Sequence, residues 1–122
     1  MKSFEAFIRE REEQNKIVLD NAGKQIKRFF NIDTNVYKSK ALPRKTKELL
    51  GLATSLVLRC DDCVKYHLLQ CLKTGVKDAE LEETFSVALV VGGSIVIPHL
   101  RRAFYFWHEI KDNKGAIDEK KI

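Results

Sequence analysis

The chain has 122 residues, 44% of them apolar, and carries 22 Lys and Arg against 17 Asp and Glu, a formal charge of +5. This length and apolar content predict one domain, residues 1–122, with its own core. The odd count of three cysteines and the charged start MKSFEAFIREREEQ exclude a disulfide-stapled exported scaffold, so the cytoplasm is the expected location.

The sequence also argues against membranes and nucleic acids as partners. The longest weakly polar run, from Phe85 to Ile97, is too short to span a bilayer, so no membrane association is expected. Five basic residues gather between positions 38 and 47, but no nucleic-acid motif accompanies them. We interpret this cluster as a solvated surface and expect no nucleic-acid partner.

An all-α fold follows from the scarcity of chain breakers, six glycines and two prolines. Apolar periodicity predicts helices over about residues 4–13 and 17–31, followed by a connection to residue 42. Pro43 suits the first turn of the next helix, whose apolar stripe ends near Arg59. These segments make up the first half of the domain.

The second half begins with a helix that starts at or beside Cys60 and stops at Gly75, where a left-handed C-terminal residue belongs. Asp78 is the predicted N-cap of the following helix. The segment SVALVVGGSIVIP is ambiguous, because its β-branched residues and central Gly-Gly would also allow a hairpin. We expect two helices there, since a lone hairpin in a helical domain has little to pair with.

The C-terminal part is predicted as a helix over residues 98–110 and a polar tail over residues 111–122. The helix is crowded with aromatic residues, more than one side of a monomer needs. A subunit interface is therefore expected on it. The aromatic residues concerned are Phe104, Tyr105, Phe106 and Trp107.

The chemically distinctive stretch is RCDDCVKYH, residues 59–67, which sets two cysteines three apart and a histidine four residues later. On a helix at about 100° per residue, Cys60, Cys63, His67 and Cys71 share one stripe. Cys60 belongs to the first turn and is expected nearest to solvent. A metal site, a thiol redox couple and ordinary packing are the three interpretations.

A metal site would use Cys60, Cys63 and His67 as soft ligands. Cys71 could not join them, because it lies about 16 Å from Cys60 along a continuous helix. Structural zinc usually takes ligands from two segments, and the sequence offers no second C-x2-C or histidine pair. A zinc-stabilised binding protein is nevertheless the non-enzymatic alternative.

A redox couple would exploit the start of the helix, where unpaired N–H groups and the helix dipole stabilise a thiolate. The C-x-x-C spacing lets one sulfur resolve a sulfenic acid on the other, closing a disulfide. His67, one turn later, could shuttle the proton. Asp61 and Asp62 complicate this interpretation, because their charges oppose a neighbouring thiolate.

Ordinary packing is the third interpretation, since cysteine behaves as a small core residue. We adopt it for Cys71, in the helix body, but coincidence is a weaker explanation for the pair together with His67. The remaining histidines, His99 and His108, have no matching partner spacing and are interpreted as non-ligands.

Glu48 lies on the edge of the apolar stripe of the helix before Cys60. From local sequence alone, it is an exposed helix glutamate beside lysines. If the chain reverses near residues 59–62, however, two helices form a hairpin and Glu48 comes opposite His67. A carboxylate there would fix the tautomer of the imidazole and give a relay from Glu48 through His67 to Cys63.

These residues together resemble the carboxymuconolactone decarboxylase superfamily, in its alkylhydroperoxidase AhpD-like branch. The resemblance rests on the pattern E-x11-C-x2-C-x3-H, with KELL around Glu48, CDDCVKYH from Cys60, then Gly75 and the acidic residues 78–83. It covers about residues 42–93. It implies an all-helical domain with the C-x-x-C at the start of a core helix, assembled as a homotrimer or homohexamer.

The resemblance also implies an enzyme that reduces small hydroperoxides. Cys63 would attack the peroxide, Cys60 would be the more exposed resolving thiol, and Glu48 with His67 would be the proton relay. A redox-active disulfide would serve in place of any cofactor or metal, recharged by a thiol or lipoyl electron donor. Decarboxylases proper lack this cysteine pair, so the resemblance does not imply lactone decarboxylation.

One departure concerns the residue before the second cysteine. The AhpD pattern has a histidine there, whereas this chain has Asp62, which puts the proton path and the peroxidase rate in question. Thiol–disulfide exchange with a protein or lipoyl partner, without peroxidase activity, is therefore the alternative enzymatic function.

Overall fold

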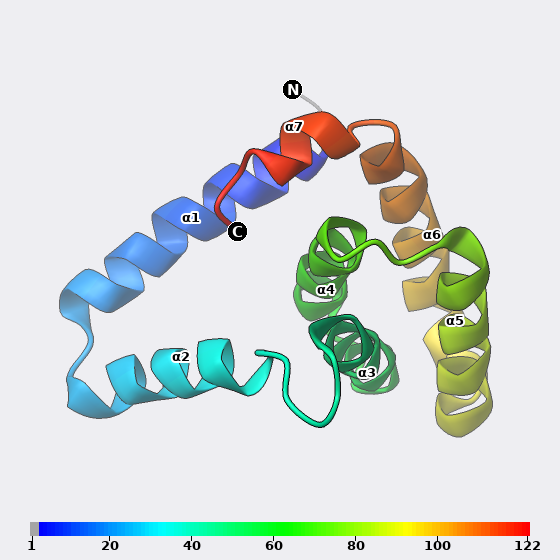
Figure 1. Ribbon diagram of the computed structural model, residues 1–122, viewed down its shortest axis with the longest axis horizontal. Coiled ribbons are helices and arrows are strands. Elements are labelled where there is room, and N and C mark those ends of the chain that lie inside the picture. Colours follow the sequence, from blue (N-terminus) through cyan, green and yellow to red (C-terminus); the bar gives the residue numbers. More distant parts are fainter. Residues whose placement is uncertain (1–2) are drawn as a thin grey trace.

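The computed structural model describes residues 3–122, which form helices and no strand (Figure 1). The all-α prediction is thereby confirmed. In chain order the elements are α1 (Ser3–Asn21), α2 (Lys24–Val36), α3 (Arg44–Val57), α4 (Asp61–Lys73), α5 (Asp78–Gly92), the 3-10 turn η1 (Ser94–Val96), α6 (Ile97–Lys111) and α7 (Lys114–Asp118).

The core forms around α4, which packs against α3 on one side and α6 on the other, while α3 also packs against α5. Seven side chains of α4 are buried, two of them polar, because neighbouring helices cover it on more than one side. They are Val64, His67, Leu68, Leu69, Gln70, Cys71 and Leu72. The helix that begins with the cysteine pair is thus the central helix of the domain.

The first two helices extend away from this core (Figure 1). The start of α1 packs on α6, where the ring of Phe7 meets that of Phe106 edge to face. Helix α2, in contrast, has no buried residue. Its apolar side chains Ile26, Phe29, Ile32 and Val36 are all about half exposed or more.

The predicted boundaries of these two helices are wrong. The sequence QNK at residues 14–16 contains no breaker, and α1 runs through it to Asn21. The break comes at Gly23, which is the extended N-cap of α2. Helix α2 then continues to Val36, beyond the predicted end at residue 31.

The ambiguous segment around Gly92 forms helix, as expected. Helix α5 ends at Gly92, Gly93 adopts a φ of 80°, and the chain continues through η1 into α6. Asp78 is the first residue of α5 and not its N-cap. Its carboxylate accepts a hydrogen bond from Trp107 Nε1 at 2.7 Å. Lys77 takes the N-cap position, and its N–H donates to Glu80 Oε1 at 2.9 Å.

The C-terminal segment is more than the polar tail that was predicted. It forms the short helix α7, whose Ile117 is fully buried, and Ile122 packs against the core. Two isoleucines in a polar stretch were too few to reveal this by periodicity. No helix in residues 3–122 is long and apolar enough to cross a membrane.

The four consecutive aromatic residues of α6, Phe104 to Trp107, are divided between the core and the surface. Phe106 and Trp107 are buried, so half of the group expected at an interface serves the core. Phe104 and Tyr105 remain 45% and 72% exposed. An interface on α6 therefore has fewer aromatic side chains at its disposal than the sequence indicated.

Candidate active site

The turn between α3 and α4 brings the two predicted site helices side by side. Arg59 adopts a left-handed φ of 60°, and the N–H of Cys60 donates back to the carbonyl of Ser55 at 3.0 Å. The chain reverses there, so α3 and α4 form the hairpin on which the approach of Glu48 to His67 depended.

Cys60 and Cys63 are joined by a disulfide at the start of α4, with their Cα atoms 5.3 Å apart. Cys60 is the N-cap residue of the helix, and its Sγ accepts the N–H of Cys63 at 3.2 Å. The sulfur thus takes the place that a serine or aspartate oxygen usually has at a helix start. A backbone N–H that donates to sulfur at a helix start favours a thiolate there in the reduced protein.

The exposure of the two cysteines is opposite to the expected order. Cys63 is exposed, whereas Cys60 is half-buried. The reason is the capping contact, which folds the Cys60 side chain over the first turn, while Cys63 lies on the outer side of α4. The third cysteine, Cys71, is fully buried and unpaired, as the packing interpretation predicted.

Glu48 and His67 form a buried pair between α3 and α4. His67 Nδ1 lies 2.9 Å from Glu48 Oε1, and both side chains are almost inaccessible to solvent. The interpretation of Glu48 as an exposed helix residue is wrong, because the stripe of α3 that it borders faces α4. A carboxylate on Nδ1 directs that proton toward itself and leaves Nε2 free to accept one.

Gly51 provides the space for the imidazole. It lies on α3 one turn after Glu48, and a Cβ atom placed on it would come within 2.6 Å of His67 Cε1 and 2.8 Å of Nε2. No side chain fits between α3 and the ring. The glycine therefore sets the depth at which His67 sits between the helices.

The second oxygen of Glu48 is supported by Arg44, one turn earlier on α3. Arg44 Nε lies 3.5 Å from Glu48 Oε2, which is otherwise without a hydrogen bond among the described residues. The guanidinium also donates to the buried Gln70 at 2.9 Å, and Gln70 donates to the carbonyl of Ile122 at 3.0 Å. The i,i+4 spacing of Arg44 and Glu48 was the one sequence signal for this contact.

Two tyrosines complete the surroundings of His67. The hydroxyl of Tyr37 lies 3.5 Å from Nε2, and the ring of Tyr66 meets the imidazole edge to face at 5.3 Å. Burial, with the negative charges of Asp33 and Glu48, raises the pKa of Tyr37, so its hydroxyl stays a donor. Sequence analysis missed both tyrosines, because Tyr37 reaches the site from beyond the end of α2.

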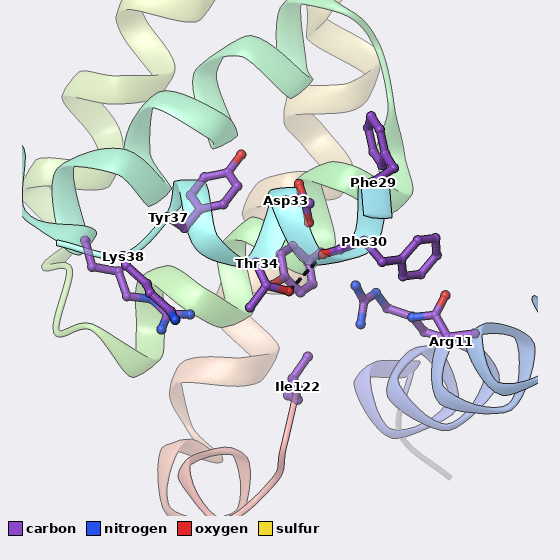
Figure 2. A pocket seen from close by; sticks show the side chains of 11 residues that line it. Arg11, Phe29, Phe30, Asp33, Thr34, Tyr37, Lys38 and Ile122 are labelled. Carbon is purple, nitrogen blue, oxygen red and sulfur yellow. Dashed lines mark hydrogen bonds between the residues drawn. The ribbon is translucent and has the colours of Figure 1, made fainter. Parts of the chain in front are cut away.

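Two cavities lie near this site, one lined by His67 and the other by Tyr37 and Tyr66. One of about 430 Å³ is lined by His67, Gly51 and apolar residues such as Leu42 and Leu50. The other, of about 560 Å³, lies between α1, α2 and the core, and Tyr37, Tyr66 and Arg44 line its inner side. Figure 2 shows Asp33 and Phe30 of α2, with Tyr37 just after that helix, on one side of it and Arg11 of α1 on the other.

The expected relay is present only in part. Glu48, His67 and Tyr37 are connected, but no hydrogen bond among residues 3–122 joins His67 to either sulfur of the disulfide. Nor does any group of three His, Cys, Asp or Glu side chains in that range come close enough to hold a metal ion. The ligand set Cys60, Cys63 and His67 considered from sequence therefore does not assemble.

Three basic side chains of the cluster at residues 38–47 bind groups elsewhere in the chain. Lys47 donates to the backbone carbonyls of Val36 and Lys38, and Lys45 pairs with Glu80 at 2.8 Å. With Arg44 directed at Glu48, these side chains tie α3 to its neighbours. Whether the cluster binds a partner stays a prediction from the sequence.

Comparison with known proteins gives a family match over most of the helical core. The model of the carboxymuconolactone decarboxylase family matches residues 26–105. The chain is 47% identical to a Thermotoga maritima protein, TM1620, whose crystal structure superposes with a TM-score of 0.88 over 96% of this chain and 99% of that one. That protein is described as a "carboxymuconolactone decarboxylase family protein possibly involved in antioxidative response".

Two curated relatives match over shorter stretches. The 4-carboxymuconolactone decarboxylase of Acinetobacter baylyi is 29% identical over 85 residues, 70% of this chain. A Cupriavidus necator protein is 34% identical over 53 residues, 43% of this chain. The matched stretches cover 61% and 47% of those two proteins, so the chain spans only part of the curated relatives.

Proposed function

The chain belongs to the carboxymuconolactone decarboxylase family, and we propose that it is a thiol-dependent oxidoreductase that reduces hydroperoxides through Cys60 and Cys63. The observation that carries this proposal is the disulfide at the start of the buried helix α4, one turn from the Glu48–His67 pair. The antioxidative description of the Thermotoga relative supports it.

The proposed cycle uses the two sulfurs in sequence. The Cys63 thiolate attacks the outer oxygen of a hydroperoxide ROOH, and the O–O bond breaks. The OH group stays on Cys63 as a sulfenic acid, and the alkoxide RO⁻ takes up the proton that the Cys63 thiol released on ionising and leaves as ROH. The sulfenic acid on Cys63 then reacts with the Cys60 thiol, forming the disulfide and releasing water. The exposure of Cys63 supports its role in the first step, since a peroxide must reach the attacking sulfur.

The second half of the cycle needs an electron donor, for which we propose a thiol or dihydrolipoyl group. Two donor thiols reduce the Cys60–Cys63 disulfide by exchange and are themselves oxidised to a disulfide. Glu48 and His67 would accept and return the protons. Since His67 has no direct hydrogen bond to sulfur, this relay operates through the bound substrate or a water molecule.

The test separates the roles of the two cysteines. Cys63→Ser should abolish peroxide consumption, because the attacking sulfur is gone. Cys60→Ser should permit one oxidation and then stall with a sulfenic acid on Cys63, which a dimedone adduct would reveal by mass spectrometry. Equal loss of the first oxidation in both variants would contradict this order.

Disulfide exchange with a protein or lipoyl partner, without peroxidase activity, is the second candidate. The observation that favours it is the exposed Cys63, which has no hydrogen bond from His67 among the described residues. Such a protein would oxidise dihydrolipoamide stoichiometrically but would not consume cumene hydroperoxide. Measuring both reactions on the same preparation distinguishes the two candidates.

We further propose that the chain assembles with copies of itself as a homotrimer or homohexamer. Helix α2 has an exposed apolar face and no buried residue, and a helix of this length has little stability without packing. Exposed Val87, Val90 and Val91 on α5 form a second apolar surface. One copy's α2 covering another copy's apolar surface would bury both.

A further inference from the structure

Asp61, the first residue of α4 and the neighbour of Cys60, is held by two residues of α6. Its Oδ1 lies 2.7 Å from His99 Nδ1, and its Oδ2 accepts from Arg102 Nε at 2.9 Å. Both carboxylate oxygens are thus occupied by groups from a helix 38 and 41 residues away in sequence. The start of α4, with its cysteine pair, is fastened to α6 at this point.

The geometry indicates which nitrogen of His99 carries a proton. Arg102 Nη2 also lies 3.2 Å from Nδ1, but a guanidinium can only donate. The shorter contact, at 2.7 Å, is to a carboxylate, which can only accept. Nδ1 therefore carries a hydrogen and donates it to Asp61, and the approach of Arg102 to Nδ1 is proximity alone.

The adjacent aspartate provides a contrast within the same helix turn. Asp62 is exposed and makes no hydrogen bond or ion pair with any residue from 3 to 122. Both aspartates lie in the first turn of α4, beside the sulfurs. Only Asp61 has its charge compensated, so the two differ in what they do to a thiolate at the helix start.

We propose that Asp61 and Arg102, oriented by His99, act as a positioning and charge-compensating clamp that sets the reduction potential of the Cys60–Cys63 pair. The proposal rests on the redox role of that pair. The Arg102 cation offsets the carboxylate that the sequence places next to Cys60. The helix start therefore keeps the positive potential that stabilises a thiolate.

The effect of these charges on the reduction potential is measurable as the equilibrium between the protein and glutathione. Two glutathione thiols give two electrons and two protons, the Cys60–Cys63 bond breaks, the protein becomes a dithiol, and glutathione disulfide forms. Any charge that stabilises a thiolate of the reduced pair shifts this equilibrium toward the dithiol. An uncompensated carboxylate beside the sulfurs shifts it toward the disulfide.

Two single variants should therefore act in opposite directions. Asp61→Asn leaves Arg102 without its anion and should raise the equilibrium constant for reduction by glutathione, roughly threefold to tenfold for charges at this partly exposed site. Arg102→Gln leaves Asp61 uncompensated and should lower the constant by a similar factor. The double variant Asp61→Asn/Arg102→Gln should return close to the wild-type value, because neither charge remains.

The measurement is an equilibrium titration of the full chain in glutathione buffers, quenched with an alkylating agent and read by intact mass. Asp62→Asn is the matched control, which removes an exposed carboxylate from the same turn and should shift the constant less than Asp61→Asn does. Shifts of the same sign in Asp61→Asn and Arg102→Gln would mean that the clamp acts only by holding the helix, and would overturn the proposal.

This titration contains no peroxide, so its outcome is independent of peroxidase activity. If the protein fails to reduce hydroperoxides but the two variants shift the constant in opposite directions, the clamp proposal stands and the peroxidase proposal fails. If the wild-type protein reduces hydroperoxides but neither variant changes the equilibrium constant, the peroxidase proposal stands and the clamp proposal fails.

Discussion

The imidazole of His67 and the carboxylate of Glu48 face each other at 2.9 Å across the interface of α3 and α4, with the glutamate fully buried. A buried carboxylate is costly unless it is paired, and here the partners are His67 and, at 3.5 Å, Arg44. The arrangement holds the ring in one tautomer, with Nε2 directed toward Tyr37 and the cavity beside Gly51.

Gly51→Ala should displace His67, because the new Cβ would lie closer to the ring than any normal contact allows. Misplacing a proton-transfer group by about 1 Å can cost on the order of 100-fold in rate. We expect a drop of roughly tenfold to 100-fold in peroxide turnover, measured as consumption of cumene hydroperoxide. Gly115→Ala is the control, since a Cβ there meets nothing within 4 Å; equal loss in both variants would argue against this account.

Glu48→Gln tests the charge of the pair with little change in shape. The amide oxygen can still accept from His67 Nδ1, so the midpoint of thermal unfolding should change little. Turnover should fall by roughly 10² to 10⁴, the usual contribution of acid–base groups. Glu48→Ala should in addition lose about 1–3 kcal/mol of stability, because the buried His67 N–H is left without a partner. Full activity in Glu48→Gln would remove Glu48 from the relay.

Cys71 should be chemically silent in the folded protein. Burial, with the nearby charge of Glu48, raises the pKa of the Cys71 thiol far above that of an ordinary cysteine. Because the thiolate is the reactive form, iodoacetamide should leave native Cys71 unmodified even at mildly alkaline pH, where exposed cysteines ionise. Peptide mapping of reduced protein should find Cys71 labelled only after unfolding. Labelling of native Cys71 at the rate of Cys63 would contradict its place in the core.

The assembly proposal is tested on α2. Phe29 is 70% exposed, and Phe29→Gln should weaken association if this face packs on another copy. Leu58, 71% exposed in the turn after α3, is a control of matched exposure, and Leu58→Gln should leave the assembly intact. Sedimentation velocity measures both. A wild-type protein that sediments only as a monomer would refute the proposal.

Much of this fold could be predicted from local pattern. The stripe of Leu52 and Leu56 on α3 and the breaker at Gly75 gave the central helices close to their observed bounds. The helix predicted to start at or beside Cys60 and to stop at Gly75 is α4, Asp61–Lys73. In contrast, α1, α2 and α7 were misjudged, since α2 has no buried face and α7 has only Ile117 to mark it.

The sequence motif predicted part of the candidate site. The spacing of Glu48 and His67 to the cysteines led to their pairing, once the hairpin of α3 and α4 was assumed. The relative exposure of Cys60 and Cys63 was not accessible in this way, because it depends on the capping contact of one sulfur. Tyr37 and the clamp of Asp61 with Arg102 involve contacts across distant segments, for which no spacing rule exists.

The most direct test of the redox claim is peptide mapping of fully reduced protein after one equivalent of hydrogen peroxide, following a check for bound zinc. The account predicts rapid and selective formation of the Cys60–Cys63 disulfide, with Cys71 still a free thiol that alkylates once the protein is unfolded. Thiols that remain unreacted, or stoichiometric zinc released only on oxidation, would contradict the account.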